Sequence, residues 1–196
     1  MGKINVIGVS GKVGSGKSFV AQHISDKTGI KLVKLDYQAA QVANMPILKQ
    51  LLQRTLKLKI PKPHNDIQLF PLMKNMERHF TKLEFALFRK FLNGKVKKII
   101  QEAKEPIIID FVALPILKAV KSFDVIYLLE SDEEMRFKKL GERDGMSVDD
   151  AKRIDKIMEP YYKINESFEF DDVITINYQV LPRNVDEIIF RLTSEN

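Results

Sequence analysis

The chain has 196 residues, of which 44% are hydrophobic and 30% are charged, and this composition predicts a soluble globular protein with a substantial core. It contains no cysteine, which excludes disulfides, a thiol nucleophile and cysteine-ligated metals. Its net charge of +6 is unevenly spread, because residues 45–104 hold 14 Lys and Arg but only 4 Asp and Glu. This basic middle is either a set of helices with solvated lysine faces or a surface that attracts an anionic partner.

The sequence pattern predicts no membrane span and no targeting segment. The longest apolar run, residues 107–117, is interrupted by Asp110 and Pro115 and is too short to cross a bilayer. The start of the chain lacks the apolar stretch of a signal peptide. We therefore expect a cytoplasmic protein without a membrane partner, either a monomer or a weak homo-oligomer.

The first third of the chain begins with a strand–helix–strand pattern. Residues 4–9 form a short apolar run, which predicts a buried parallel strand. A helical pattern runs from Lys17 to a stop signal at Gly29. Residues 30–35 predict a second strand that ends at Asp36.

The basic middle has helical spacing instead. Residues 45–60 predict a helix that Pro61 and Pro63 interrupt, and residues 79–100 predict a longer one. Five large apolar residues share one face of the longer helix: Phe80, Leu83, Leu87, Phe91 and Leu92. We interpret this stripe as a core face rather than as a stacking platform for nucleic-acid bases.

Strands and helices alternate again after residue 104. Strands are expected at residues 107–110, 124–129 and 172–176, and helices at residues 133–143, 148–158 and 184–193. This alternation implies an α/β fold with a parallel sheet that helices cover on both faces.

Residues 11–18, GKVGSGKS, match the pattern G-x-x-x-x-G-K-[ST] and lie between an expected strand and an expected helix. The glycines permit backbone angles that other residues avoid, so that N–H groups can surround a phosphate chain at the helix N-terminus. Lys17 is then expected to reach the β- and γ-phosphates of ATP, and Ser18 to bind Mg²⁺. A dinucleotide-binding loop fits less well, because the glycines follow the order G-x-x-G-x-G. The fold is therefore expected to be of the P-loop NTPase type.

Two aspartates end expected strands. Ligands of open α/β sheets bind beyond the carboxyl ends of the strands, so Asp36 is expected to point into the site and accept the proton of an attacking hydroxyl. The alternatives for Asp36 are a solvated strand end or a helix cap. Asp110 either binds Mg²⁺ through water, contacts the acceptor, or makes a structural hydrogen bond.

Arg136, Lys139 and Arg143 are spaced to share one face of the helix expected at residues 133–143. Phosphoryl transfer needs positive charge on the migrating group, and in small P-loop kinases a mobile lid with such residues closes over the nucleotide. A plain surface helix is the alternative. Three histidines are scattered without the spacing of metal ligands: His23, His64 and His79.

The chain resembles the dephospho-CoA kinase family. Five segments carry the resemblance: VIGVSGKVGSGKSFVA at residues 6–21, VKLDYQAAQV at 33–42, KLEFALFRKFL at 82–92, the long stretch at 123–155 and DDVITINY at 171–178. The resemblance implies one kinase domain with a core at about 1–44 and 105–196, a helical acceptor-binding insertion at about 45–104 and a lid at about 136–150.

The resemblance also implies a reaction and a set of site residues. The reaction is phosphorylation of the 3′-hydroxyl of dephospho-CoA with ATP and Mg²⁺, with Asp36 as the base and Lys17 and Arg143 as the charge-stabilising residues. The implied nucleotide contacts are Gly11, Lys12, Val13, Gly14, Ser15, Gly16, Lys17, Ser18, Phe19, Lys139, Arg143 and Asn177, and the implied metal ligand is Ser18.

Departures from the family pattern fall mainly on the acceptor side. Lys34 replaces the first aspartate of a paired motif, and Phe88-Arg89 replaces His-Pro. Residues 112–114 replace a Pro-Leu-Leu segment, and Lys139 replaces the first lid arginine. The alternatives are a kinase of a nucleoside or nucleotide and, ranked lower for want of an RNA-binding signature, a non-enzymatic nucleotide-binding module whose basic region binds nucleic acid.

Overall fold

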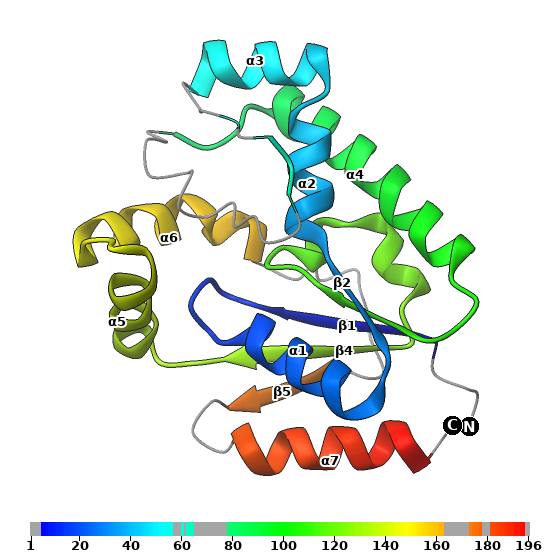
Figure 1. Ribbon diagram of the computed structural model, residues 1–196. Coiled ribbons are helices and arrows are strands. Elements are labelled where there is room, and N and C mark those ends of the chain that lie inside the picture. The colour runs from blue at the N-terminus through cyan, green and yellow to red at the C-terminus, as the bar shows by residue number, and fades with distance from the viewer. Residues whose placement is uncertain are drawn as a thin grey trace.

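The computed structural model describes residues 5–56, 60, 62–64, 78–162, 173–177 and 181–194. Within them, five parallel strands form one sheet in the order β2-β3-β1-β4-β5 (Figure 1). The strands are β1 (Val6–Gly11), β2 (Lys31–Lys34), β3 (Ile107–Asp110), β4 (Val125–Glu130) and β5 (Val173–Asn177). The α/β architecture with a parallel sheet, expected from the sequence, is confirmed.

The strand register brings distant parts of the sequence to one edge of the sheet. Val9 of β1 and Lys34 of β2 both pair with Asp110 of β3. On the other side of β1, Gly11 pairs with Leu129 of β4. Because all strands are parallel, their carboxyl ends meet at this edge, where ligands of open α/β sheets bind.

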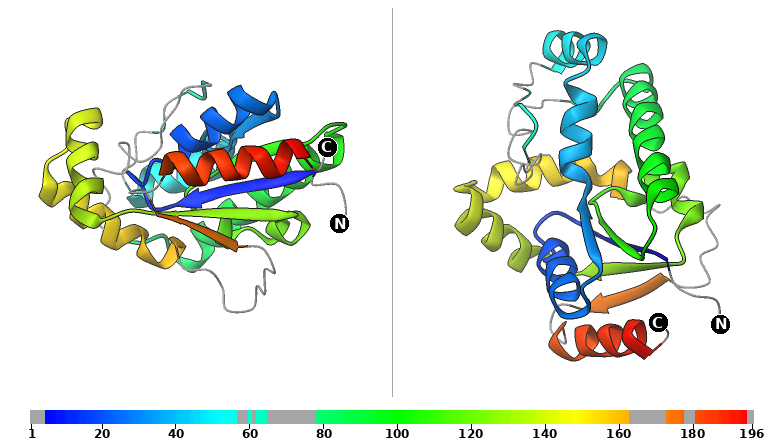
Figure 2. Two further views of the ribbon diagram at one scale, coloured as in Figure 1. Left: turned by 90° about the horizontal axis from the view of Figure 1, so that it is seen from below. Right: turned by 45° about the vertical axis from the view of Figure 1, so that its right-hand side comes forward.

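Helices cover both faces of the sheet (Figure 2). One face packs against α1 (Lys17–Thr28) and α7 (Leu181–Ser194), whose apolar side chains join those of the strands in one core cluster. The other face carries a larger cluster to which α2 (Leu35–Ala43), α6 (Val148–Tyr162) and the 3₁₀ turns η2 (Leu114–Ile116) and η3 (Lys118–Ser122) contribute. β1 and β3 are buried along their whole length between these layers, as their apolar runs predict.

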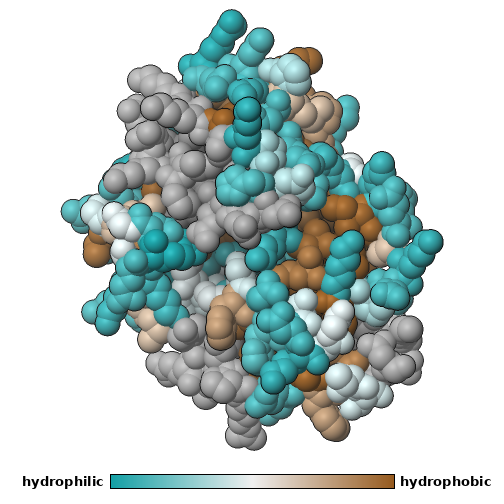
Figure 3. All heavy atoms as spheres, in the orientation of Figure 1, coloured by the Kyte–Doolittle hydropathy of each residue, from teal (hydrophilic) through white to brown (hydrophobic). Residues whose placement is uncertain are grey.

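The basic middle forms α3 (Pro46–Leu56) and α4 (Lys82–Glu102), which pack against α2 and against each other. Figure 3 shows hydrophilic side chains along their outer sides. A capping box starts α4: the N–H of Glu84 donates to Thr81 Oγ1, and the N–H of Thr81 donates to the Glu84 carboxylate. Residues 57–59, 61 and 65–77, which include the predicted break at Pro61, lie outside the described residues.

The buried face of α4 differs from the predicted stripe. Leu83 is 63% exposed and Phe91 is 37% exposed, whereas Leu92 is buried as expected. Glu84, Asn93 and Val96 complete the buried face. The polar members are accommodated by hydrogen bonds, since Arg78 donates to Glu84, and Asn93 accepts the N–H of Ala119 in η3. Phe80 precedes the helix.

After β4, the chain forms α5 (Glu133–Asp144), turns at residues 145–147 and returns as α6. These two helices stand beyond the carboxyl edge of the sheet, opposite α3 and α4 (Figures 1 and 2). In the described part of the chain, no helix combines the length and the apolar character that crossing a membrane requires.

Candidate nucleotide and acceptor site

The loop between β1 and α1 has the geometry of an anion site. Gly14 and Gly16 have φ values of 81° and 90°, in the left-handed region that favours glycine. Gly16 is the N-cap residue of α1, and no side chain caps this helix end. The N–H groups of the first turn therefore lack a capping side chain, at the positive end of the helix dipole.

Ser15 occupies the inside of this loop. It is fully buried, and its N–H donates to the carbonyl oxygen of Lys12 at 3.1 Å, whereas its hydroxyl has no hydrogen-bond partner among the described residues. Buried polar atoms are normally satisfied, so this hydroxyl fits a ligand in the loop. Lys17 follows at the start of α1 and is half-buried, and Ser18 is exposed. The loop thus has the features that a phosphate chain requires.

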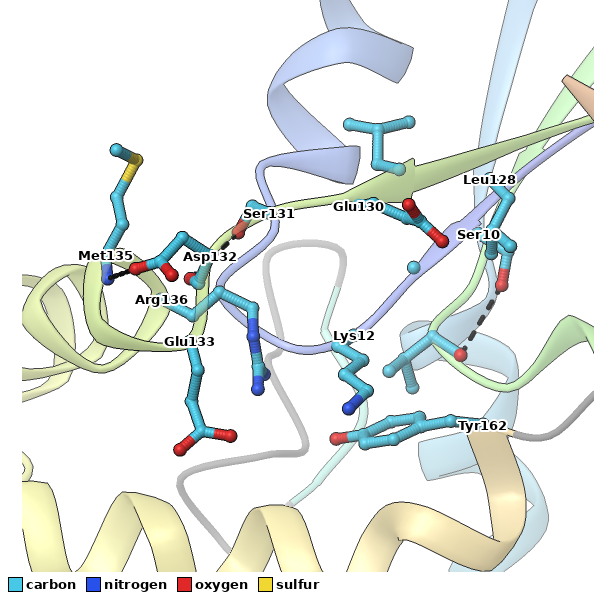
Figure 4. Close-up of a pocket in the computed structure, with 13 residues that line it drawn as sticks. Ser10, Lys12, Leu128, Glu130, Ser131, Asp132, Glu133, Met135, Arg136 and Tyr162 are labelled. Atoms are coloured by element: carbon cyan, nitrogen blue, oxygen red, sulfur yellow. Dashed lines mark hydrogen bonds between the residues drawn. The ribbon is translucent and has the colours of Figure 1, made fainter. Parts of the chain in front are cut away.

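A cavity of about 470 Å³ lies beside the loop (Figure 4). The start of the loop, the end of β4, the first turn of α5 and the end of α6 line it. Lys12 extends across this cavity, with its Nζ 5.9 Å from the centre of the Tyr162 ring. Glu130, at the end of β4, and Asp132 and Glu133, at the start of α5, also line the cavity. The cavity is therefore bounded by the loop, β4, α5 and α6.

Arg136, Lys139 and Arg143 lie in one helix at the predicted spacing, but Arg136 is buried, so the expectation that it serves with them as a lid cation is wrong. It is 1% exposed, and its Nη1 and Nη2 donate to the two carboxylate oxygens of Asp155 in α6 at 2.9 and 2.8 Å. Nη1 also donates to the carbonyl oxygen of Val13 in the loop at 3.0 Å. Burial opposes the charge of this guanidinium, but the Asp155 carboxylate, together with Tyr162 and Glu133, outweighs burial and raises the pKa of Arg136.

Arg143, in contrast, is exposed near the end of α5. Its Nε and Nη2 donate to the two carboxylate oxygens of Asp144 at 2.7 and 2.6 Å, and the Asp144 side chain is 6% exposed. Its guanidinium is thus oriented by its neighbour in the chain. Lys139, one turn earlier, is half-buried.

Asp36 lies in the first turn of α2, just beyond the carboxyl end of β2. The expected strand end at Asp36 is displaced by two residues, because β2 ends at Lys34 and α2 begins at Leu35, whose side chain is fully buried. Lys34 is the N-cap residue, so Asp36 is not the cap. Asp36 therefore stands at the same sheet edge as the loop, two strands away.

Asp110 ends β3, between β1 and β2. It is 6% exposed, and its Oδ1 has no hydrogen-bond partner among the described residues. A buried carboxylate oxygen without a partner costs free energy unless a ligand or water binds it. Asp110 is therefore a candidate group for a cation or an acceptor at the centre of this edge.

The segment before α4 connects the basic insertion to α6. His79 Nδ1 lies 2.8 Å from the carbonyl oxygen of Ile157, and the N–H of Phe80 donates to the hydroxyl of Tyr161. Both nitrogens of the Arg78 fork donate to the buried carboxylate of Glu84, which lowers the pKa of Glu84 to about 2. Side-chain contacts thus attach this segment both to α6 and to the start of α4.

The remaining expected nucleotide contacts lie at the ends of elements. Phe19, in the first turn of α1, is 68% exposed and stacks on His23, with ring centres 6.2 Å apart. Asn177 is the last residue of β5, paired in register with Glu130 of β4, so its backbone reaches the same sheet edge. The ring contact of Phe19 is thus with His23 and not with the loop.

The described residues offer no cluster of three or more His, Asp and Glu side chains that alone would hold a metal ion. A Mg²⁺ ion bound together with phosphates needs only one or two protein groups, because phosphate oxygens and waters supply the other ligands. Ser18 and the unpartnered Asp110 oxygen are of the oxygen type that Mg²⁺ prefers, so the donor set fits such an ion.

Sequence reasoning missed Asp155 and Tyr162, which surround Arg136 at the end of the loop. Asp155 is 8% exposed and lies among the apolar positions Ala151, Ile154 and Met158 on the buried side of α6. An acidic residue inside an apolar helical stripe was the available signal, since such a residue requires a buried partner.

Comparisons with known structures support the same fold. The chain resembles a gluconokinase from Sinorhizobium meliloti 1021 with 15% identity, a TM-score of 0.57 and coverage of 97% of this chain and 92% of that one. It resembles shikimate kinase from Bacteroides thetaiotaomicron with 13% identity, a TM-score of 0.56 and 98% coverage of both chains. For deoxyadenosine kinase from M. mycoides with bound dATP, identity is 15%, the TM-score 0.54 and coverage 96% of this chain and 99% of that one.

At this level of identity, the solved structures establish the fold alone, which is that of P-loop kinases. No curated protein matches the sequence. A sequence model described as dephospho-CoA kinase, however, matches residues 5–179, which include the loop, both predicted aspartates and the helices α5 and α6. The chain is therefore a kinase that belongs to the dephospho-CoA kinase family.

Proposed function

We propose that this protein transfers the γ-phosphoryl group of ATP to the 3′-hydroxyl of dephospho-CoA, giving coenzyme A and ADP. The observation that carries the proposal is the loop at residues 11–18, with its left-handed glycines, its uncapped helix and its unpartnered Ser15 hydroxyl, in a chain that matches the family over residues 5–179. Phosphate binding by main-chain N–H groups explains why the glycines stand where they do.

On the nucleotide side, Lys17 and Arg143 supply positive charge to the migrating group. Lys17 starts α1 directly after the loop, so its ammonium is tethered beside the phosphate chain. Arg143 projects from the exposed end of α5 and exchanges Asp144 for phosphate oxygens when nucleotide binds. The other nucleotide contacts of the proposal are the backbone of the loop, Phe19, Lys139 and Asn177.

On the acceptor side, Asp36 orients the acceptor hydroxyl and accepts its proton as the oxygen bonds to the γ-phosphorus and the bond to the β–γ bridging oxygen breaks. Its place in the first turn of α2, at the carboxyl edge, supports this role. The insertion at residues 45–104, with its excess of lysine and arginine, suits an acceptor that carries a pyrophosphate.

A Mg²⁺ ion bound between the phosphates would neutralise charge that develops on the transferring group. Ser18 would hold the ion directly, and Asp110 would hold it through water. Both residues stand at the carboxyl edge, at the end of the loop and at the end of β3.

A nucleoside or nucleotide kinase is the second candidate, because the acceptor side departs from the family pattern. Lys34 ends β2 in register with Asp110, where the pattern has an aspartate. In α4, Phe88 and Arg89 occupy the positions where the family pattern has His-Pro. Phe88 stacks on Phe80, and the Arg89 guanidinium lies 5.4 Å from the centre of the Phe85 ring. These changes alter the side chains that surround the acceptor and leave the loop unchanged.

The test is ATP consumption by the purified chain with Mg²⁺ and a panel of dephospho-CoA, nucleosides and nucleoside monophosphates. The proposal predicts turnover with dephospho-CoA at least about tenfold more efficient, by kcat/KM, than with any other member of the panel. Turnover with a nucleoside and none with dephospho-CoA would establish the second candidate instead.

A further inference from the structure

The lid helix α5 packs directly on the tip of the phosphate-binding loop. A Cβ added to Gly14 would lie 2.9 Å from the carbonyl oxygen of Arg136 and 3.2 Å from its Cβ. Beside it, Val13 is 4% exposed and belongs to the larger core cluster. The absence of a side chain at Gly14 therefore allows the loop and the helix to meet.

One guanidinium joins the loop to both lid helices. Arg136 of α5 bonds to both oxygens of Asp155 in α6 and, through Nη1, to the carbonyl oxygen of Val13. A planar fork held at two points by a carboxylate has a single orientation, and its third bond therefore has a fixed direction. The position of the Val13 carbonyl is set by α6 as well as by α5.

The orientation of this carbonyl matters because a peptide unit is planar. The Val13 carbonyl and the Gly14 N–H belong to one trans peptide and point in opposite directions. A hydrogen bond that draws the carbonyl toward Arg136 therefore directs the Gly14 N–H away from Arg136. Gly14 lies in the middle of the loop, whose N–H groups are its means of binding phosphate.

The two charged partners are themselves buried, since Arg136 is 1% exposed and Asp155 is 8% exposed. Tyr162 closes the end of α6 beside the pair, where burial and then the Asp155 carboxylate raise the pKa of its hydroxyl, so that the ring is neutral near pH 7. Lys12, at the start of the loop, lies over this ring (Figure 4). Residues of α6 thus support the loop at two neighbouring positions: Tyr162 contacts Lys12, and Asp155 holds the arginine that bonds to Val13.

We propose that Arg136 is a positioning residue: held by Asp155, it fixes the Val13–Gly14 peptide and so sets the phosphate-binding geometry of the loop. Its Nη1 and Nη2 donate to Asp155 and Val13, so its part in this proposal is to hold the loop and not to bind a phosphate. This inference rests on the proposed function and adds to it the residue pair that shapes the nucleotide site. Through Arg136 and Asp155, the position of α6 is coupled to the conformation of the loop.

The experiment replaces the whole pair, because Arg136→Ala alone would leave Asp155 buried and unpaired and would destabilise the fold. The double variant Arg136→Met/Asp155→Leu exchanges the pair for apolar residues of similar size, a change that is often neutral for stability. Arg136→Lys keeps the charge and loses the fork. The control is Arg153→Met, which removes an ion pair of 3.2 Å with Asp150 on the same helix, away from the loop.

The readouts are the Kd of ADP with Mg²⁺, by titration calorimetry without an acceptor, and the midpoint of thermal unfolding. We expect the Kd of the double variant to rise about tenfold or more, while its unfolding midpoint stays within a few degrees of the wild type. The KM of ATP should rise in parallel and the KM of the acceptor should not change. Arg136→Lys should give a smaller rise, and Arg153→Met none.

The outcomes separate this inference from the kinase assignment. A folded double variant with an unchanged Kd overturns the inference and leaves the kinase assignment standing. Should the double variant fail to fold, an unchanged Kd in Arg136→Lys overturns the inference in the same way. A wild-type chain that binds no nucleotide overturns both.

Discussion

The two sides of the sheet edge are built in different ways. On the side of β1 and β4, the site is main chain: a loop with left-handed glycines, held by a buried arginine. On the side of β2 and β3, the proposed acceptor groups are side chains instead: Asp36 in the first turn of α2 and the buried Asp110 at the end of β3. The first side matches the family pattern in the loop, and the second carries most of the departures. A phosphate site made of backbone N–H groups depends on few side chains. Residues on the proposed acceptor side can therefore change while the phosphate-binding loop keeps its pattern.

The largest effect should come from the lysine of the loop. Lys17→Met removes the charge tethered beside the phosphates and should lower kcat at least about a thousandfold. The measurement is ATP consumption with saturating acceptor. Lys27→Met, at the exposed far end of α1, is the control and should keep the wild-type rate. A Lys17→Met variant within tenfold of wild type would contradict the assignment of the loop.

Asp36→Asn tests the acceptor side. Loss of the base should lower kcat about a hundredfold or more, while the Kd of ADP stays the same, because the loop is untouched. Asp26→Asn removes an exposed carboxylate from α1 that accepts a hydrogen bond from Gln22, and it should have no effect. Full activity in Asp36→Asn would refute its role as base.

Arg143→Ala should have an intermediate effect, a loss of up to about a hundredfold in kcat/KM for ATP. Asp144→Asn sharpens the test, because it weakens the carboxylate that competes with phosphate for the Arg143 fork. The KM of ATP should therefore fall in Asp144→Asn. Steady-state kinetics with varied ATP measure both. Wild-type parameters in Arg143→Ala would show that the lid arginine is a surface residue.

Glu84→Gln should affect stability and leave nucleotide binding unchanged. It removes the charged partner of Arg78 and weakens the capping box of α4, at a cost of about 2 kcal/mol in the free energy of unfolding. Urea unfolding measures this cost, and the Kd of ADP serves as the control. An unfolding free energy equal to that of wild type would show that the buried carboxylate does not hold the insertion in place.

The same carboxylate predicts a pH dependence. The pKa of Glu84 is lowered from 4.5 to about 2 by Arg78, so the folded state favours the ionised form. Its contribution to stability is present above about pH 4.5 and is lost as the pH falls through about 2. The difference in unfolding free energy between wild type and Glu84→Gln should therefore shrink over this range. A difference that stays constant would contradict the lowered pKa.

The sheet, the loop and the order of elements could be predicted from sequence because they leave local signals. Apolar runs mark β1 and β3, and the glycine pattern at residues 11–18 requires a strand before it and a helix after it. The apolar pattern predicts a strand that continues to Asp36, whereas β2 ends at Lys34 and Asp36 belongs to α2. The reason is that Leu35 suits both the end of an apolar strand and the buried start of α2. Local apolar pattern cannot separate the two.

Other errors arose from contacts between residues far apart in the chain. The buried face of α4 includes Glu84 and Asn93, whose partners, Arg78 and the N–H of Ala119, lie outside the helix. Arg136 and Arg143 are both basic and seven residues apart on α5, and spacing alone puts them on one face. Asp155, nineteen residues after Arg136, pairs with Arg136 in the interior, whereas Arg143 stays at the surface.

The proposed reaction takes dephospho-CoA as its acceptor, although the departures from the family pattern lie mainly on the acceptor side. Its most direct test is the product: dephospho-CoA incubated with ATP, Mg²⁺ and the purified chain, followed by phosphorus NMR and mass spectrometry. We expect one added phosphoryl group per molecule, carried as a monoester on the ribose 3′-oxygen, and loss of this product with Lys17→Met. A phosphoryl group on another oxygen, or no product while a nucleoside is phosphorylated, would contradict it.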